Sequence, residues 1–284
     1  MITNPNVKIN LGLNVLRKRE DGFHDLETLF VPYFGINDTL EIVVGDDYSR
    51  TSAAIFGKYA PEMIAQGITE DGKLMITIAR KDGVDWDPLK DLTAKAYYIL
   101  CEDFDLPPVK IYLEKNSPVG AGLGGGSADA AFALKMLNEL CGLGQTEQQL
   151  ASYAARLGSD CAFFVYNRPM IGEGRGEILT EIDADFMDTI NSEYDLQVLT
   201  PEGVAVSTKD AYGGLRPHLP EVPLREALAR PVDQWNGILV NDFEETVFAK
   251  YPELAAIKRS LYDSGAAYAS MSGSGSALFA LYRK

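Results

Sequence analysis

The chain has 284 residues, enough for one large domain or two ordinary ones, and 46% of them are apolar. Its 41 acidic and 26 basic residues give a net charge of −15. This charge argues against non-specific binding to nucleic acid or to an anionic membrane, because both need a basic surface. A small anionic ligand is not excluded, since local N–H groups and a few lysines can hold one.

The cysteine and histidine content also limits the function. Three cysteines, at positions 101, 141 and 161, are odd in number and fit no metal-ligand spacing. With only His24 and His218, a histidine-based metal site is not expected, and no metal ligand can be assigned. We find no signal peptide and no apolar run of membrane-spanning length. We therefore expect a cytoplasmic protein with reduced cysteines and neither a membrane nor a nucleic-acid partner.

The first part of the chain predicts a run of strands. Residues 7–16 alternate between an apolar and a polar face, which is typical of a half-buried strand. The apolar face carries Ile9, Leu11, Leu13 and Val15, and the polar face carries Lys8, Asn10, Gly12 and Asn14. After a charged turn at 17–22, we expect strands at 23–34 and 39–44. Residues 45–72 show no readable pattern and are expected to be irregular.

The rest of the chain mixes helices and strands in an irregular order. Thr146 and Gln149 form a capping box for a helix through Leu157, which Gly158 ends. Residues 165–177 and the Pro-rich segment 216–231 are expected to be loops. The remaining expected elements are helices at 91–104, 128–141, 241–249 and 252–264, strands at 109–114 and 195–200, and an apolar run ending at 282. This order favours an α+β fold over a repeating βαβ fold.

The most informative segment is the Gly-rich loop 118–127, whose glycines are Gly120, Gly122, Gly124, Gly125 and Gly126. It follows a strand and runs into a helix, for which Ser127 has the chemistry of an N-cap. Glycines let the backbone approach a phosphate closely and adopt positive φ. The free N–H groups and the positive end of the helix dipole then face the anion. The loop therefore predicts a bound phosphate, in the first instance from a nucleotide.

The loop by itself leaves the nucleotide chemistry open. It is not a Walker A loop, because no Gly-Lys-Ser/Thr sequence ends it. Residues 120–125 match the dinucleotide pattern G-x-G-x-x-G, but the preceding strand 109–114 alternates, which marks a strand solvated on one face, as in antiparallel sheets. A flexible glycine linker is the bland alternative, and the flanking strand and capped helix argue against it.

Three segments together carry a family resemblance. They are Pro5-Asn-Val-Lys8-Ile-Asn10-Leu, the Gly-rich loop, and Met271-Ser-Gly-Ser-Gly275. This ordered triple resembles the GHMP kinase superfamily over nearly the whole chain. The resemblance implies a two-domain α+β kinase fold with ATP and substrate in the cleft between the domains. We place the N-terminal domain with the Gly-rich ATP loop at 1–166 and the C-terminal domain at 167–284.

Further segments narrow the resemblance. They are 19–30, which contains Asp-Gly-Phe-His24, then Leu157-Gly-Ser-Asp160-Cys-Ala-Phe-Phe164 and Gly172-Glu-Gly-Arg-Gly-Glu-Ile-Leu179. They resemble the superfamily members that move the γ-phosphate of ATP to the 2-hydroxyl of a cytidine diphosphate methylerythritol, in the non-mevalonate route to isoprenoid precursors. This resemblance implies ATP with Mg²⁺, because hard cations bridge phosphate oxygens.

The resemblance also implies catalytic roles for Asp160 and Lys8. Asp160 matches the aspartate taken as the base, since a carboxylate within hydrogen-bond reach can accept the hydroxyl proton. Lys8 matches its paired lysine, whose ammonium keeps a carboxylate ionised and offsets charge on the transferring group. The residues alone leave two alternatives open. Asp160 could be a helix N-cap after Gly158, and Lys8 could lie on a solvated strand face.

The family's cytosine site falls on Phe23 and His24, where an aromatic ring can stack on the base and an imidazole can bond its polar edge. Family members usually have tyrosine at position 23, so this chain lacks one hydroxyl. Asn10 shares the strand face of Lys8 and is expected to reach the substrate. Thr208 and Tyr212 match the position where the family places a hydroxyl and a second aromatic ring against the cytidine.

The expected ATP contacts are the loop and the strand end before it. Lys115 could meet the nucleotide or could be an exposed strand end. Asp129 and Asp91 stand where the family more often has asparagine, so the finer nucleotide contacts are open. The 272–276 loop is expected to close over the site or pack on the Gly-rich loop. The full set is Lys115, Pro118, Val119, Gly120, Ala121, Gly122, Leu123, Gly124, Gly125, Gly126, Ser127 and Ala128.

Three rival functions remain at this stage. Another GHMP kinase, of the homoserine or mevalonate type, has no use for the Phe23-His24 cytosine pocket. A catalytically silent nucleotide-binding sensor would not need both Lys8 and Asp160. A dinucleotide-binding oxidoreductase fits only the glycine pattern. The sequence does not determine the oligomeric state.

Overall fold

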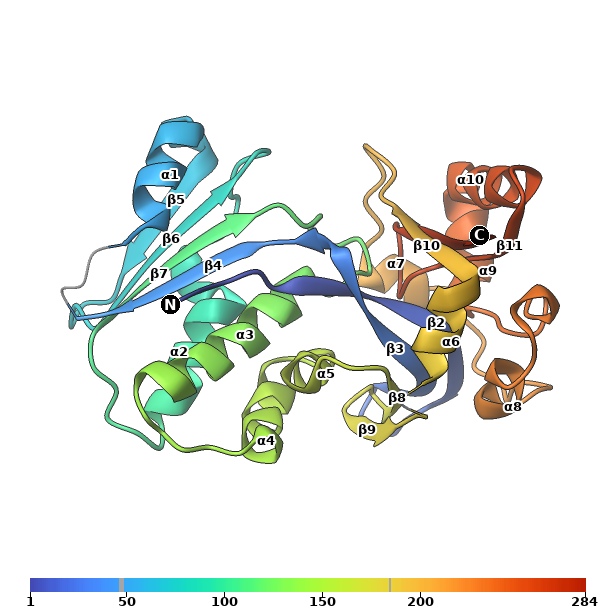
Figure 1. The fold of residues 1–284 in the computed structure, drawn as a ribbon, viewed down its shortest axis with the longest axis horizontal. Helices are drawn as coiled ribbons and strands as arrows, with labels where there is room; N and C mark the ends of the chain where they lie inside the picture. Colours follow the sequence, from blue (N-terminus) through green and yellow to red (C-terminus); the bar gives the residue numbers. More distant parts are fainter. Residues whose placement is uncertain (46–48, 184) are drawn as a thin grey trace. The chain divides into compact units, whose positions relative to one another are not determined.

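The structure, a computed structural model, describes residues 1–45, 49–183 and 185–284 (Figure 1). These residues form two compact units. The first contains residues 1–7, 33–119 and 124–167, and the second contains residues 8–32, 120–123 and 168–284. The chain passes between the units at five points, two of them inside the Gly-rich loop. The passage at Asn167–Arg168 lies next to the expected domain boundary at 166/167.

A five-stranded sheet of order β1-β4-β7-β6-β5 forms the framework of the first unit. The strands are β1 (Ile2–Thr3), β4 (Thr39–Val44), β5 (Ile64–Ile68), β6 (Leu74–Arg80) and β7 (Val109–Lys115). β7 pairs antiparallel with β4 and parallel with β6, so the sheet is mixed. The alternation of β7 predicted a face open to solvent, which is wrong at Tyr112. This side chain is 7% exposed because α1 (Thr51–Lys58) covers that face, where Ile55 and Tyr112 share a small apolar cluster.

The other α-helices of the first unit lie on the side of this sheet opposite α1 (Figure 1). They are α2 (Leu92–Cys101), α3 (Gly125–Leu140), α4 (Glu147–Leu157) and α5 (Cys161–Tyr166), with short 3₁₀ turns η1 (Pro61–Met63) and η2 (Pro88–Lys90). The predicted capping box of α4 is confirmed. Thr146 Oγ1 accepts from the Gln149 N–H at 3.3 Å, and Gln149 Oε1 accepts from the Thr146 N–H at 2.8 Å. Gly158 ends this helix as expected.

The second unit contains two sheets. One has the order β2-β3-β8-β9, from β2 (Asn6–Lys18), β3 (His24–Asn37), β8 (Met170–Gly174) and β9 (Ile178–Glu181); the first two strands also contribute residues to the first unit. The other is antiparallel with the order β10-β12-β11, from β10 (Tyr194–Leu199), β11 (Ala266–Met271) and β12 (Leu278–Arg283). The helices are α6 (Phe186–Glu193), α7 (Thr208–Tyr212), α8 (Leu224–Leu228), α9 (Phe243–Lys250) and α10 (Pro252–Asp263), with the turn η3 (Val232–Gln234).

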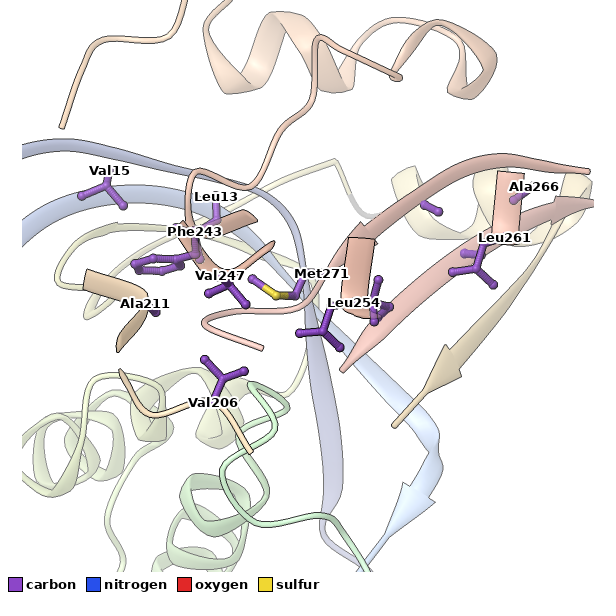
Figure 2. Close-up of a cluster of buried hydrophobic side chains, with 13 residues drawn as sticks. Leu13, Val15, Val206, Ala211, Phe243, Val247, Leu254, Leu261, Ala266 and Met271 are labelled. Atoms are coloured by element: carbon purple, nitrogen blue, oxygen red, sulfur yellow. The ribbon is translucent and has the colours of Figure 1, made fainter. Parts of the chain in front are cut away.

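A buried apolar cluster packs β2, α7, α9, α10, β11 and β12 together (Figure 2). Leu13 and Val15 enter it from β2, Phe243 and Val247 from α9, and Met271 from β11. Tyr212, at the end of α7, is half-buried against the same cluster. The core therefore fixes the strand that carries Lys8 against the segment that carries the 272–276 loop.

Four expectations need correction. Residues 45–72 are not irregular, because they contain α1, η1 and β5; residues 46–48 of that segment lie outside the described residues. The loop expected at 165–177 contains the end of α5 and all of β8. The loop expected at 216–231 contains α8. These elements are short, so sheet pairing and packing decide them rather than sequence periodicity.

The fourth correction concerns the start of α3. The helix begins at Gly125, not after Ser127, and its N-cap is Gly124 in the left-handed region at φ +71°. A positive φ is a conformation that glycine adopts at little cost, so the loop enters the helix earlier than the Ser127 cap predicted. Ser127 lies in the first turn.

The α+β fold class is confirmed. Every helix of the described ranges is too short or too polar to cross a lipid bilayer.

Candidate active site

β2 brings Lys8 and Asn10 to one face, and both are buried at 2% exposure. The Lys8 ammonium donates to Asn10 Oδ1 at 2.5 Å and to the Gly122 carbonyl at 2.8 Å, and it lies 5.5 Å from the Phe30 ring centre. Asn10 in turn donates to Thr28 Oγ1 at 3.0 Å. Burying an ammonium is costly unless polar partners replace water, and the two oxygens and the ring offset this cost. The alternative in which Lys8 lies on a solvated strand face is therefore wrong.

The 120–123 part of the Gly-rich loop is held inside the second unit. Its backbone joins β2 through the Lys8 N–H to Leu123 carbonyl bond at 2.9 Å. It joins the 272–277 turn through the Ala277 N–H to Ala121 carbonyl bond at 3.0 Å. Ser272 Oγ also donates to the Gly122 carbonyl at 3.0 Å. The expected packing of the 272–276 loop on the Gly-rich loop is therefore confirmed.

Gly122 is needed at its position for two separate reasons. Its φ is +76°, and a Cβ built there would lie 2.1 Å from the Ser272 carbonyl oxygen. Gly120, by contrast, has a φ of +73° but open space around its Cβ position. Gly120 and Gly122 therefore have different structural roles. Gly122 permits close packing on the protein, whereas Gly120 leaves the loop surface open to a ligand.

Two polar residues missed by the sequence reasoning hold the turn on which the loop packs. Asn241 Nδ2, on a side chain 3% exposed, donates to the Met271 carbonyl at 2.7 Å and to the Gly273 carbonyl at 2.9 Å. A Glu244 oxygen accepts from the Met271 N–H at 2.8 Å, and its other oxygen accepts from Lys258 at 2.5 Å. The signal available in the sequence was the run Asn241-Asp-Phe-Glu244 at a helix start, which reads equally well as ordinary capping.

The remainder of the loop opens α3 in the first unit. Val119 is 51% exposed, and Gly126, at the first turn of α3, is also exposed. The first N–H groups of a helix have no carbonyl partner within it, and its N-terminal end carries partial positive charge. Exposed glycine at such a helix start can accept a phosphate without a steric barrier. The expected phosphate contacts at Gly124, Gly125, Gly126, Ser127 and Ala128 all lie on this loop-to-helix junction.

Lys115 is not an exposed strand end. It is 6% exposed, and its ammonium donates to Asp38 at 2.5 Å, to Asp129 at 2.6 Å and to Ser117 Oγ at 3.1 Å. Burial disfavours the charged ammonium, but the two carboxylates outweigh it and raise the pKa of Lys115. Burial also raises the pKa of Asp129 well above its ordinary value, although Lys115 opposes the shift. We take Lys115 to be fully charged, because two carboxylates lie within hydrogen-bond distance of it.

Asp160 precedes α5 in the first unit and is half-buried. It occupies the N-cap position, but its side chain makes no capping hydrogen bond to the helix. The alternative role as a side-chain cap is therefore not supported. The neighbouring Cys161 is unreactive, since burial raises the pKa of its thiol to about 12 against the opposing effect of a hydrogen bond from Ser127.

Aromatic side chains gather at the predicted cytosine site in the second unit. The His24 and Tyr212 rings stack with centres 4.7 Å apart and planes at 26°, and Tyr212 meets Phe243 edge-on at 4.8 Å. Phe23 is 53% exposed, and the Arg175 guanidinium lies 5.0 Å from its ring centre. Burial, followed by the charge of Lys18, lowers the pKa of His24, so the imidazole is neutral at pH 7. Thr208 begins α7 and is exposed.

Sequence comparison places this chain in a known family. The family model for the GHMP kinases N terminal domain matches residues 91–168, and that for the GHMP kinases C terminal matches residues 224–284. The fold agrees, since a crystal structure of a homoserine kinase from Cytophaga hutchinsonii aligns over 98% of this chain and 85% of its own, with a TM-score of 0.62 at 17% identity. These findings define the class as GHMP kinases.

Similarity over the full chain identifies one family within the GHMP kinases. The 4-diphosphocytidyl-2-C-methyl-D-erythritol kinase of Bacteroides fragilis is 44% identical over 282 residues, covering 99% of this chain and 92% of its own. That of Porphyromonas gingivalis is 40% identical, covering 100% and 93%. A crystal structure of 4-(cytidine 5'-diphospho)-2C-methyl-D-erythritol kinase aligns with a TM-score of 0.72 at 29% identity, over 99% of this chain and 90% of its own. The chain therefore belongs to the GHMP kinases and, within them, to the 4-diphosphocytidyl-2-C-methyl-D-erythritol kinase family.

Proposed function

We propose that the chain transfers the γ-phosphoryl group of ATP to the 2-hydroxyl of 4-diphosphocytidyl-2-C-methyl-D-erythritol. The observation that carries this assignment is the 44% identity over 99% of the chain to relatives that bear the name of that kinase. The three cysteines are free within the described residues, which supports action in the reducing cytoplasm.

ATP is assigned to the Gly-rich loop. Its exposed positions Val119, Gly120 and Gly126 leave the backbone open to phosphate oxygens, and the N-terminus of α3 adds partial positive charge. Pro118, Ala121, Leu123 and the α3 start shape the same loop. We propose Mg²⁺ as the companion of ATP, since this ion is held largely by nucleotide phosphates and one or two carboxylates. Within the described ranges no group of three or more histidine, cysteine or acidic side chains is placed to hold a metal ion.

Asp160 is assigned as the base that accepts the proton of the 2-hydroxyl as the phosphoryl group arrives. Lys8 is assigned to stabilise the charge on the transferring group. Its ammonium is fixed at the carbonyl of Gly122, within the loop proposed to hold ATP, so the cation is positioned before any ligand arrives. Phosphoryl transfer needs chiefly such positioning and charge neutralisation.

The cytidine is assigned to Phe23, His24, Thr208 and Tyr212, and Asn10 to the acceptor end. His24 and Tyr212 lie in direct ring contact, which leaves no space for a base between them. We therefore assign base stacking to the exposed ring of Phe23, one face of which carries Arg175. The neutral imidazole of His24 can then donate to or accept from the polar edge of cytosine.

The assignment is tested by ADP release with four acceptors: the cytidyl methylerythritol substrate, mevalonate, homoserine and galactose. We expect turnover of the first and no comparable turnover of the others. Mevalonate kinase and homoserine kinase share this fold with TM-scores of 0.63 and 0.62 at 11% and 17% identity, so fold by itself does not choose between acceptors. Equal or better activity on any other acceptor would overturn the substrate assignment. ATP binding without turnover of any acceptor would favour a nucleotide sensor.

A further inference from the structure

A buried ion cluster around Lys115 lies at the base of the Gly-rich loop. The cluster consists of Asp38, Lys115, Ser117 and Asp129, all within the first unit. Their side chains come from the turn between β3 and β4, the end of β7, the start of the loop and the second turn of α3. All four residues are at most 6% exposed.

Every proton of the Lys115 ammonium is already used inside this cluster. An ammonium has three donors, and these reach Asp38 Oδ2, Asp129 Oδ2 and Ser117 Oγ. A phosphate could recruit Lys115 only by breaking one of these short bonds and drawing the side chain out of its buried position. The geometry therefore does not support a direct nucleotide contact by Lys115.

Asp38 connects the same cluster to the backbone of the loop. Its Oδ1 accepts from the N–H groups of Asn116 and Ser117, both at 2.6 Å, and its Oδ2 accepts from Ser117 Oγ at 2.6 Å as well as from Lys115. The residues that lead from β7 into the loop are thereby held to one carboxylate. Such charge-assisted bonds are roughly twice as strong as neutral ones.

The far end of the loop rests on the same side chains. A Cβ built at Gly125 would lie 2.2 Å from Ser117 Oγ and 3.4 Å from Lys115 Nζ, so the start of α3 sits directly against the cluster. Asp129, one turn further along α3, is held by Lys115, and its Oδ1 has no hydrogen-bond partner among the described residues. One lysine thus connects the strand before the loop with the helix after it.

We propose that Lys115 and Asp129 are positioning residues for ATP, which close the base of the Gly-rich loop and fix the first turn of α3 without touching the nucleotide. The assignment rests on the kinase function proposed above. Two carboxylates share one ammonium here, so the cluster carries an excess of acid beside a loop that binds polyphosphate. A lysine meant for direct phosphate contact would not be enclosed by two carboxylates.

Calorimetric titration of ATP into the folded protein, with no acceptor present, tests this assignment. Asp129→Asn is nearly isosteric, and it removes the negative charge that pairs with Lys115 while the amide oxygen can still accept from the ammonium. We expect it to weaken ATP binding by about fivefold, since the lost charge pairing costs about as much as one neutral hydrogen bond. The matched control is Asp105→Asn, which removes a surface carboxylate paired with Lys73 in the same unit and should leave ATP affinity unchanged. The KM for the acceptor should not change in either variant.

Substitution of Lys115 distinguishes positioning from direct contact. Lys115→Arg keeps the charge but cannot donate three bonds from one nitrogen, so a positioning role predicts weaker ATP binding. Asp129→Asn should then add little in the Lys115→Arg background, because the two residues act as a unit. Unchanged or tighter ATP binding by Asp129→Asn, together with normal binding by Lys115→Arg, would overturn the proposal. A wild-type chain that bound ATP but phosphorylated none of the four acceptors would overturn the acceptor assignment and leave this comparison valid.

Discussion

Replacement of Gly122 by alanine gives the sharpest test of how the Gly-rich loop is held. Gly120 and Gly122 have nearly the same backbone conformation, with φ values of +73° and +76°. An alanine at either position carries a left-handed strain of about 1–2 kcal/mol. The surroundings differ, since a Cβ at 120 meets open space, whereas a Cβ at 122 lies 2.1 Å from the Ser272 carbonyl oxygen. Gly120→Ala is therefore a matched control for Gly122→Ala.

The extra cost of Gly122→Ala follows from the bonds that the clash would disturb. The obstructing atom is backbone, so the loop and the 272–277 turn must move apart. Two hydrogen bonds hold them: Ser272 Oγ donates to the Gly122 carbonyl at 3.0 Å, and the Ala277 N–H donates to the Ala121 carbonyl at 3.0 Å. Loss of two such bonds at about 1 kcal/mol each adds about 2 kcal/mol to the strain, and more if a partner stays buried and unsatisfied.

Urea unfolding without nucleotide measures the difference. Trp235 is buried in the second unit, and its fluorescence reports on that unit in a Trp86→Phe background. We expect Gly122→Ala to lower the free energy of unfolding by about 2 kcal/mol more than Gly120→Ala does, with similar m-values. Any benefit from a less flexible unfolded chain is common to both variants and cancels. Equal stability of the two variants would show that the Ser272 contact does not constrain the loop.

Two predictions concern the chemistry and the acceptor site. Asp160→Asn should lower kcat by about 10²–10⁴ and leave ATP and acceptor binding close to normal; a fully active but destabilised variant would remove Asp160 from the mechanism. His24→Ala should raise the acceptor KM by about two- to tenfold, which corresponds to one neutral hydrogen bond, and leave the ATP KM unchanged; a parallel rise of both KM values would make His24 structural. Because burial, followed by the charge of Lys18, lowers the pKa of His24, its imidazole should gain a proton only at more acid pH than an ordinary histidine. The acceptor KM should rise as the imidazole gains this proton, and the rise should be absent in His24→Ala.

Much of the local structure could be predicted from the sequence because its causes are local. The α4 capping box joins residues three apart, and β7 is marked by alternation within a few residues. The segments 45–72 and 165–177 failed for the opposite reason. β5 and β8 exist because β6 and β3 pair with them, and neither strand carries a periodic pattern strong enough to show this.

In the candidate site, too, the sequence indicated the residues that belong to local motifs but not their partners from distant parts of the chain. Residue type and order along the chain indicated Lys8, Asp160 and the Gly-rich loop, and comparison with known kinases bears out the family that they suggested. The partners of these residues were not predictable. Asn241 and Glu244 hold the turn beneath the loop from another part of the second unit, and no local pattern distinguishes them from ordinary caps.

The sequence by itself determined the α+β class, most of the long elements and the kinase family, because hydrophobic period, glycine spacing and ordered motifs are properties of neighbouring residues. Only the tertiary structure decided that Lys8 is buried against the Gly122 carbonyl and that Lys115 is enclosed by Asp38 and Asp129. Asp38 and Lys115 are 77 positions apart, and Lys8 and Gly122 are 114 apart. The charge state, exposure and hydrogen-bond partners of a lysine depend on such distant groups, so its role is set by the packing of the chain rather than by its place in a motif.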